Sequence, residues 1–343
     1  MKKPNVAILG ATGAVGQEFI KLIVERNFPF NELRLLASER SAGKQIEVLG
    51  KIYTVEEAKA SSFDNIDIAL FAGGSASKTF APEAVKRGAV VIDNSSAFRM
   101  DPNVPLVVPE VNPESIRNHK GIIANPNCST IIMVMALKPI HQKVKIKRIV
   151  VSTYQAVSGA GKEAIEELNG QVKAISENRP VEANILPSAG LPKHYQIAYN
   201  ILPQIDVFLD DGYTKEEMKM VHETHKILED DTIKISATTI RVPVFRSHSE
   251  SVNIELEGPL SAEEARVLLG AFPGVVVQDD PAHQIYPMPL FTSDKNEVFV
   301  GRIREDNSVQ YGLNLWVVGD QIRKGAALNA LQIAEYMIEH NLF

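Results

Sequence analysis

The sequence predicts an α/β protein with two domains, one on a doubly wound parallel sheet and one of α+β type. Three observations support this prediction. Short, continuous apolar runs alternate with helical patterns as far as residue 127. A glycine-rich loop directly follows the first apolar run. Beyond that point the apolar runs lengthen, and residues 251–256 alternate between apolar and polar side chains, as in a half-exposed antiparallel sheet.

The first domain begins as a strand–loop–helix–strand unit. Residues 5–9 predict a buried strand, and apolar residues from Val15 to Ile23 recur at helical spacing before the pattern ends near Asn27. A second strand follows at 33–37. Further strands are expected at 66–71, 90–92, 106–108 and 122–124, with a helix over 78–87. Continuous apolar strands of this kind are typical of a parallel sheet that is covered on both faces.

The second domain is predicted to have a mainly antiparallel sheet. Its strands are expected at 149–155, 233–242, 251–256, 298–303 and 309–317, the last two paired across residues 304–308. A final helix is expected from about 319 to 341. We assign residues 1–127 together with 319–343 to the first domain and 128–318 to the second.

The composition limits the classes of function. A net charge of −6 argues against a nucleic-acid or anionic-membrane surface, and no apolar run reaches the length of a membrane span. The apolar run 6–9 is too short for a signal peptide. A single cysteine excludes an intrachain disulfide and favours a reducing compartment, so we expect a cytoplasmic protein.

The loop after the first strand predicts a dinucleotide site. Glycines recur every third residue at Gly10, Gly13 and Gly16, a variant of the usual spacing, and the backbone N–H groups of such a loop bind a pyrophosphate. A packing turn is the alternative. The first domain is therefore expected to be Rossmann-like. The predicted contacts are Gly10, Thr12, Gly13, Ala14, Val15 and Gly16.

The end of the second strand bears on the choice of cofactor. Glu39 could accept a ribose hydroxyl of NAD. Arg40, flanked by Ser38 and Ser41, instead suits the 2′-phosphate of NADP, because a guanidinium binds phosphate in a bidentate manner. We therefore expect NADP.

Cys128 is the candidate nucleophile. It follows the turn Asn125-Pro126-Asn127 and precedes an apolar run at 131–137, which predicts a helix that starts near the cysteine. The unpaired N–H groups and the dipole of a helix N-terminus favour a thiolate. An inert, buried cysteine is the alternative.

A thiol nucleophile needs a general base, and the spacing of the histidines does not identify which of them it is. Eight histidines are present, and His222 and His225 lie three residues apart, not the four of a zinc-binding H-E-x-x-H motif, so no metal site is expected. His248 should point to the apolar face of its strand, either as a core histidine or as an acid–base group. Arg241 would face the other way on an unbroken strand, so a bend near Pro243 is required to bring both to one site.

Three further segments have ordinary structural readings as well as functional ones. Residues 157–162 look like a phosphate loop, but the upstream glycine is missing and Glu163 replaces Ser or Thr, so a small-residue turn that caps the following helix is the simpler interpretation. Glu216 and Lys219 could belong to a surface charge pattern. Arg99 follows a sheet strand, where α/β proteins bind ligands.

Taken in order, these motifs resemble aspartate-semialdehyde dehydrogenase over nearly the whole chain. The motifs are Gly10–Gly16, Asp93–Arg99, Val108–Asn112, Asn125–Thr130, Tyr154–Gly161, Glu216–Lys219, Arg241–Val244 with His248, and Gly319–Ala327. The resemblance implies reversible, NADP-dependent reduction of L-aspartyl 4-phosphate to L-aspartate 4-semialdehyde and inorganic phosphate, a step toward lysine, methionine and threonine. It also implies a homodimer or homotetramer.

The resemblance further implies roles for individual residues. Cys128 would be the nucleophile and His248 the general acid–base, with an ordinary pKa of about 6.5 that lets it exchange the thiol proton at neutral pH. The substrate and phosphate would be bound by Arg99, Asn127, Gln155, Glu216, Lys219 and Arg241. Ser158, Gly159 and Gln321 would contact the cofactor.

Two alternatives remain open. The first is N-acetyl-γ-glutamyl-phosphate reductase, a family that shares this fold and cysteine chemistry and that the chain also resembles. The cysteine motif of that family is Asn-Pro-Gly-Cys, whereas this chain has Asn-Pro-Asn-Cys. A non-catalytic nucleotide sensor could also keep the fold. The joint presence of Cys128, Gln155, Arg241 and His248 argues against a sensor.

Overall fold

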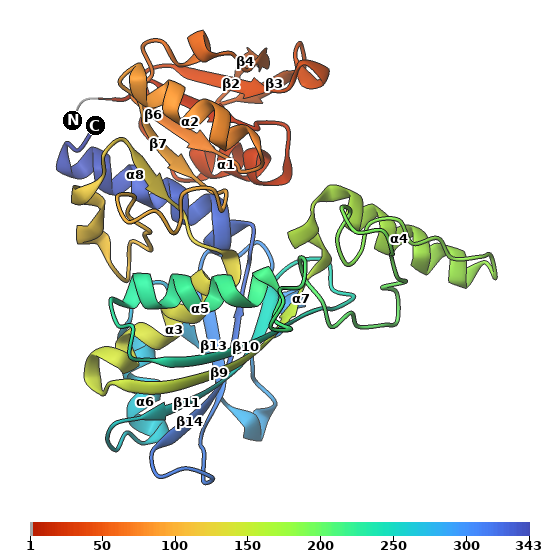
Figure 1. Ribbon diagram of the computed structural model, residues 1–343, viewed down its shortest axis with the longest axis vertical. Coiled ribbons are helices and arrows are strands. Elements are labelled where there is room, and N and C mark those ends of the chain that lie inside the picture. The colour runs from red at the N-terminus through yellow and green to blue at the C-terminus, as the bar shows by residue number, and fades with distance from the viewer. Residues whose placement is uncertain (1–2) are drawn as a thin grey trace. The chain divides into compact units, whose positions relative to one another are not determined.

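The computed structural model describes residues 3–343, which divide into two compact units (Figure 1). Unit 1 contains residues up to Asn127 and from Gly325 onward, and unit 2 contains Cys128–Lys324. Met1 and Lys2, which belong to the predicted first domain, lie outside the described residues. The chain leaves unit 2 after Lys324 and not at residue 319, because the last strand of unit 2 extends to Gly319.

Unit 1 is built on a six-stranded sheet in which every pairing is parallel. Its order is β5-β2-β1-β6-β7-β8. The strands are β1 (Val6–Leu9), β2 (Leu33–Ala37), β5 (Glu56–Glu57), β6 (Ile68–Phe71), β7 (Val90–Asp93) and β8 (Ile122–Ala124). The expected doubly wound parallel sheet is confirmed, and the chain reverses its direction of strand addition between β1 and β6, where such sheets bind ligands.

Two details of unit 1 differ from the sequence-based expectation. The expected strand at 106–108 is wrong, because only Leu106 forms a bridge, to Ala124. An antiparallel hairpin of β3 (Gln45–Val48) and β4 (Lys51–Thr54) was not predicted. Its strands are short and largely exposed, so they carry little apolar patterning.

Helices cover both faces of the parallel sheet. Val6 and Ile8 of β1 belong to a core with α1 (Ala14–Glu25) and α8 (Leu328–His340). Ala7 and Leu9 face the opposite side, with α2 (Ala76–Lys86). The final helix starts later than the expected residue 319, because β14 ends there and a single π-helical turn, Arg323–Ala327, precedes α8.

Unit 2 contains a second six-stranded sheet, ordered β10-β9-β11-β14-β13-β12. Its strands are β9 (Ile146–Gln155), β10 (Lys234–Arg241), β11 (His248–Leu256), β12 (Val275–Val277), β13 (Val298–Glu305) and β14 (Gly312–Gly319). The three central pairings are antiparallel and the two outer ones parallel. The prediction of a mainly antiparallel sheet is therefore confirmed.

The two faces of the second sheet differ. One face packs against a layer of α3 (Cys128–Lys143), α5 (Lys215–Leu228) and α6 (Ala262–Ala271), as Figure 1 shows for α3 and α5. Val151, Val252 and Ile254 are buried on this face. The other face is partly open, and Tyr154 and Trp316 contact each other there, with ring centroids 5.5 Å apart. Two further α-helices, the 15-residue α4 (Lys162–Ser176) and the short α7 (Pro289–Thr292), also belong to the unit.

The described residues give no membrane span. Within 3–343, every helix is too short or too polar to cross a bilayer.

Candidate active site

Cys128 is the first residue of the 16-residue helix α3. Its thiol is partly accessible, whereas the following residues Ser129 to Leu137 are fully buried. Because these residues are packed into the core, the N-terminus of α3 is held in a fixed position. The positive end of a helix dipole favours a thiolate at such a position.

The turn before Cys128 is fixed within unit 1. Asn125 follows β8, and its side chain donates to Asn94 Oδ1 at 2.8 Å and accepts from Asn329 Nδ2 at 2.7 Å. Asn329 also donates to the carbonyl of Val107. These amide contacts determine the path by which the chain leaves the parallel sheet.

Three of the expected site residues lie side by side at one end of the second sheet. Arg241 is the last residue of β10 and is paired in register with Gln155, the last residue of β9. His248 begins β11 on the other side of β9, opposite Gly319 of β14. We call Arg241, Gln155, His248 and Gly319 the catalytic row. All four are buried on the face that packs against α3.

A bend near Pro243 was expected to bring Arg241 and His248 together. In the structure, the chain instead leaves β10 after Arg241, crosses the end of β9 and enters β11 at His248. Arg241 and His248 end and begin two separate strands that flank β9. Residues 242–247 cross the end of β9, where Val157 and Ser158 donate to the carbonyls of Val244 and Phe245. Ser247 adopts a left-handed backbone with φ 70° directly before His248. The strand can therefore begin with its first side chain pointing inward.

The imidazole of His248 is held in one tautomer. The backbone N–H of Ala156 donates to Nδ1 at 3.0 Å, so the neutral ring carries its proton on Nε2. Nε2 is buried and has no hydrogen-bond partner within residues 3–343. Burial, and secondly the charge of Arg241, lower the pKa of His248 to about 3. The expected ordinary pKa is therefore wrong, because the ring is fully buried beside a cation.

Arg241 is fixed beside this histidine. Its Nη1 donates to the carbonyl of Ala156 at 2.7 Å, and within residues 3–343 its Nε has no partner. Burial lowers the pKa of Arg241, while Glu216 and Cys128 favour its charged form. Cys128 is therefore close enough to influence the charge of Arg241. A methyl group at Gly159 would lie 3.0 Å from Arg241 Nη1 and 3.2 Å from His248 Cε1. Gly159 therefore closes one side of the site without a side chain.

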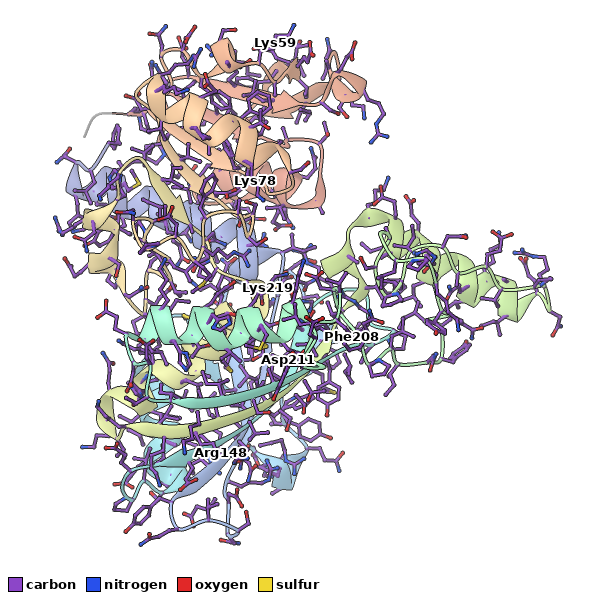
Figure 2. All side chains as sticks on the ribbon, in the orientation of Figure 1. Lys59, Lys78, Arg148, Phe208, Asp211 and Lys219 are labelled. Carbon is purple, nitrogen blue, oxygen red and sulfur yellow. The ribbon has the colours of Figure 1, made fainter. Side chains whose placement is uncertain are left out.

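A polar chain connects the catalytic row to helix α5. Gln155 Nε2 donates to Ser129 Oγ and, at 3.2 Å, to Glu216 Oε1. Lys219, which Figure 2 labels, then donates to Glu216 at 3.1 Å and to Asp206 at 3.0 Å. Glu216 is buried, so Glu216 and Lys219 are part of the site and not a surface charge pattern.

Ser158 and Gln321 belong to the same unit and contact each other. The amide of Gln321 donates to Ser158 Oγ, and its Oε1 accepts from the backbone N–H of Ser247 at 2.9 Å. Gln321 thus supports the backbone that orients His248. A contact of Ser158, Gly159 and Gln321 with a cofactor stays a prediction.

The glycine-rich loop of unit 1 has the geometry that a dinucleotide requires. Gly10 has φ 87°, and a methyl group at Gly16 would lie 2.1 Å from the carbonyl oxygen of Gly10. Only glycine permits α1 to approach β1 so closely. Gly13 caps α1 without a side chain, which leaves the N–H groups of the first turn available to an anion. The residues present therefore fit a dinucleotide pyrophosphate.

The remaining predicted ligands of unit 1 fall into two groups. Ser38 and Arg40 are exposed and Ser41 is buried, directly after β2, which neighbours β1. Arg99 is buried, and it donates to the backbone carbonyls of Asn94 and Asn125. Asn127 is also buried. The roles of these residues in binding stay predictions.

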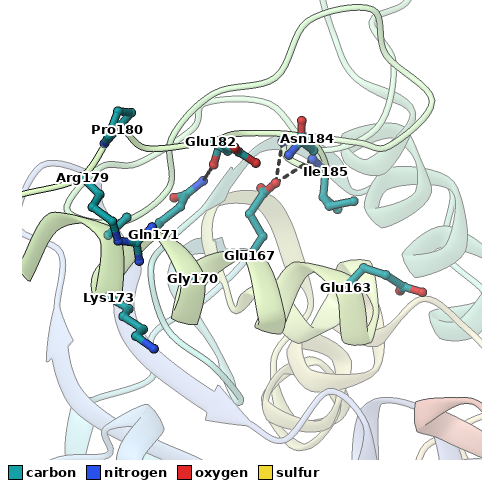
Figure 3. A pocket seen from close by; sticks show the side chains of 11 residues that line it. Glu163, Glu167, Gly170, Gln171, Lys173, Arg179, Pro180, Glu182, Asn184 and Ile185 are labelled. Carbon is teal, nitrogen blue, oxygen red and sulfur yellow. Dashed lines mark hydrogen bonds between the residues drawn. The ribbon is translucent and has the colours of Figure 1, made fainter. Parts of the chain in front are cut away.

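Two other features of the chain do not form part of this site. No group of side chains suited to a metal ion is found within residues 3–343, and His225 instead contacts the carbonyl of Ile233. A pocket of about 440 Å³ lies between α4 and the loop after it (Figure 3). There the carboxylate of Glu167, which is partly exposed, accepts from the backbone N–H groups of residues 184–186, so this acid anchors the loop.

The sequence reasoning missed two residues that support the site. Ser129 directly follows the cysteine, and its position in the motif could have revealed it. Asp206, which binds Lys219, lies in an irregular segment between α4 and α5. No periodicity marks it, so no local signal was available.

Comparisons with known proteins agree with this geometry. A family model described as "Semialdehyde dehydrogenase, NAD binding domain" matches residues 5–119. A second, described as "Semialdehyde dehydrogenase, dimerisation domain", matches residues 137–324. The two matches fall within units 1 and 2, respectively.

Individual relatives match along nearly the whole chain. An aspartate-semialdehyde dehydrogenase of Aquifex aeolicus is 59% identical over 342 residues, covering 98% of this chain and 99% of the relative. The crystal structure of aspartate semialdehyde dehydrogenase II of Vibrio cholerae complexed with ASA is 48% identical, with a TM-score of 0.94 and 99% of each chain covered. The enzyme of Candida albicans, solved with NADP, is 28% identical, with a TM-score of 0.76 over 100% of both chains. The chain belongs to the aspartate-semialdehyde dehydrogenase family of oxidoreductases.

Proposed function

We propose that the chain catalyses the reversible, NADP-dependent reduction of L-aspartyl 4-phosphate to L-aspartate 4-semialdehyde and inorganic phosphate. The observation that carries this proposal is the catalytic row together with Cys128 of α3. A thiol at a helix N-terminus, a guanidinium, an amide and a neutral Nε2–H imidazole gather in one unit. This set is suited to acyl transfer through a thioester.

The cations of the site define the substrate class. Arg241 offers a planar fork to the α-carboxylate of an amino acid. Glu216 offers a carboxylate to its ammonium group, and Lys219 offers a point charge to the phosphate. Arg99 and Asn127 of unit 1 are assigned to the phosphate and substrate through the motifs that carry them.

The covalent steps use Cys128 and His248. The thiolate attacks the carbonyl carbon of the acyl phosphate, a C–S bond forms, and the C–O bond to phosphate breaks to give a thioester. Bound NADPH supplies the hydride that reduces the acyl carbon. The Nε2–H of His248 donates a hydrogen bond to the developing alkoxide, which then collapses to the aldehyde as the C–S bond breaks and the thiolate of Cys128 is regenerated. Gln155 orients the acyl group from its bonds to Ser129 and Glu216.

NADP is the cofactor that unit 1 favours. The pyrophosphate would lie on the loop from Gly10 to Gly16, and the 2′-phosphate on Arg40 with Ser38 and Ser41. The structure of the Candida albicans relative, which was solved with NADP, supports this choice. Since a thiolate nucleophile must stay reduced, we place the protein in the cytoplasm.

The direct test measures NADPH formation from aspartate semialdehyde with and without inorganic phosphate. We expect turnover only with phosphate, no turnover in Cys128→Ala, and a loss of about 10²- to 10⁴-fold in His248→Asn, the usual contribution of an acid–base group. An active Cys128→Ala enzyme would refute the nucleophile assignment.

Two other functions are distinguished by the same preparation. Turnover of N-acetyl-glutamate semialdehyde but not of aspartate semialdehyde would establish the N-acetyl-γ-glutamyl-phosphate reductase. A non-catalytic sensor would show no turnover with either substrate and would keep its biological role in Cys128→Ser. The relatives reported above favour the aspartate enzyme.

The match to a dimerisation domain supports an oligomer, and we propose a homodimer or a homotetramer that uses the open face of the second sheet. Tyr154 and Trp316 are partly exposed on that face. A groove of about 330 Å³ adjoins Trp316, and the segment beside it exposes Leu290 and Phe291 by 80% and 64%. Such an apolar area marks an interface.

The oligomer is tested by sedimentation of Leu290→Glu beside Val267→Glu. Val267 is 65% exposed on α6, so it is a matched control for a new charge. We expect only Leu290→Glu to shift the protein toward the monomer. An unchanged mass for Leu290→Glu would place the interface elsewhere.

A further inference from the structure

Glu250 is a buried acid that the proposed mechanism does not use. It lies two residues after His248 on β11, on the same inward face. Its side chain is fully buried. Within the described part of the chain, neither carboxyl oxygen has a hydrogen-bond partner. A buried polar group of this kind requires a physical explanation.

The neighbours of Glu250 across the sheet are hydroxyl groups. Thr153 of β9 is directly opposite Glu250, and Thr239 of β10 is directly opposite Thr153. On the other side of Glu250, β14 contributes Val317. We call Thr239, Thr153, Glu250 and Val317 the lower row, because it lies one step below the catalytic row. All four are fully buried, and both threonine hydroxyls lack a partner within residues 3–343.

The protonation state follows from this composition. An ionised carboxylate without a cation or a donor is too costly to bury, so the group becomes neutral instead. Burial alone raises the pKa of Glu250 well above its usual range. A neutral carboxylic acid both donates and accepts, and so does each threonine hydroxyl. Directly opposite Cβ atoms are about 4.5 to 5.5 Å apart, and because these groups do not bond to one another directly within residues 3–343, one water is suited to bridge them.

The neutral state matters to His248. Two residues along a strand span about 7 Å. A carboxylate at that distance in a buried setting would favour the imidazolium. The imidazolium carries a proton on Nδ1, where Ala156 N–H already donates. An ionised Glu250 would therefore oppose the tautomer that presents Nε2–H to the substrate.

We infer that Glu250 is a neutral carboxylic acid that is bridged by water to the hydroxyls of the lower row and acts as a positioning residue for His248. In this role, Glu250 fixes the position of β11 directly below the catalytic row. Because its carboxyl group is neutral, it also places no negative charge near the imidazole. The role in turnover rests on the proposed function, whereas the protonation state does not.

The protonation state is tested by infrared difference spectroscopy of wild type against Glu250→Gln at neutral pH. We expect the wild type to show the carbonyl band of one protonated carboxylic acid that the variant lacks. A pair of carboxylate bands in its place would overturn the inference. Because this readout does not use turnover, it stands whether or not the proposed function holds.

The positioning role is tested by comparing Glu250→Gln with Glu250→Met. The amide keeps a neutral donor and acceptor, so we expect kcat within about threefold of wild type. Methionine fills the space without hydrogen bonds, and we expect kcat to fall about tenfold while KM stays nearly constant. Equal losses in both variants would show that the charge is needed, and no loss in Glu250→Met would exclude a positioning role.

A second variant covers the case in which Glu250→Met does not fold. Thr153→Val removes the hydroxyl opposite Glu250 and keeps the shape of the side chain. We expect a smaller fall in kcat than for methionine, again without a change in KM. Wild-type kcat in a folded Thr153→Val enzyme would show that the lower row does not act on His248.

Discussion

His248 accepts a backbone N–H at Nδ1, and this bond determines which of its nitrogens can act on a substrate. The pattern of β11 predicts correctly that the side chain points inward. It cannot predict the tautomer, because the donor, Ala156, follows a different strand and meets His248 only through the sheet. His248 is therefore a neutral hydrogen-bond donor at Nε2. It is not the readily charged histidine that an ordinary pKa would predict.

A pH-dependent stability difference follows from the lowered pKa of His248. Between pH 6.5, the usual value, and about 3, the unfolded chain binds a proton that the folded ring does not. The folded state therefore loses stability as the pH falls through this range, by up to about 1.4 kcal/mol per pH unit. We expect denaturant titrations to show wild type losing stability against His248→Asn as the pH decreases.

The exposed His222 offers a matched control for that experiment. Solvent reaches His222 in the folded and the unfolded chain, so His222→Asn should follow the wild-type curve. A constant difference between wild type and His248→Asn from neutral to acidic pH would contradict the buried, neutral imidazole.

The residues that the sequence reveals are those that belong to local motifs. Cys128 was found from its turn and helix, and Gln155 and Arg241 from the family motifs. Glu250 carries a readable signal as well, since it is a charged residue at an inward position of an alternating strand. Asp206 carries none, because its contact with Lys219 depends on how an irregular segment packs.

At the scale of elements, α5 shows how one side chain can both start a helix and place it. Glu217 forms a capping box with Thr214, and its second oxygen accepts from the backbone N–H of Thr239 at 2.9 Å. The same carboxylate thus caps α5 and joins it to β10. This joint fixes Glu216 and Lys219, on the same turn of α5, relative to Arg241 at the end of β10.

Removal of this joint should lower both stability and substrate affinity. In Glu217→Ala the N–H groups of Thr214 and Thr239 lose their acceptor in a buried place, and we expect a loss of about 2 to 3 kcal/mol. KM for the substrate should rise several-fold because Glu216 and Lys219 shift. Denaturant unfolding and steady-state kinetics measure the two effects.

Glu264 provides the control for Glu217. It forms the same capping box with Ser261 at the start of α6, but in an exposed place and without a bond to a central strand. Glu264→Ala should therefore lose about 1 kcal/mol at most and leave KM unchanged. If both variants changed KM alike, the joint between α5 and β10 would not position the substrate residues.

The elements that could be predicted are those with a strong apolar pattern. β2 and α2 were expected within two residues of their observed bounds, because their apolar residues repeat without interruption. The hairpin of β3 and β4 was not predicted from the sequence, and neither was the late start of α8. In the latter case Asp320 accepts from the N–H groups of Ile322 and Arg323, which forms a turn where periodicity alone suggests a helix.

At the scale of the whole molecule, unit 1 is assembled from both ends of the chain. Its sheet comes from the first 127 residues, and α8 completes the core on one face. Unit 2 is a continuous insertion between them, and it contains the catalytic row. Folding of unit 1 therefore requires that the chain returns after unit 2, so a ligand of unit 1 reports on the folding of the entire chain.

Cofactor binding should therefore stabilise the protein against unfolding. Arg40 should determine whether NADP or NAD stabilises it more. At one hundred times the dissociation constant, a ligand adds about 2.7 kcal/mol. We expect NADP to raise the melting temperature more than NAD at equal concentration. Arg40→Ala should remove this difference, because the 2′-phosphate loses its guanidinium partner. Lys44→Ala, an exposed cation in the same region, should keep it. Equal stabilisation of wild type by both cofactors, or an unchanged NADP effect in Arg40→Ala, would contradict a 2′-phosphate site at Arg40.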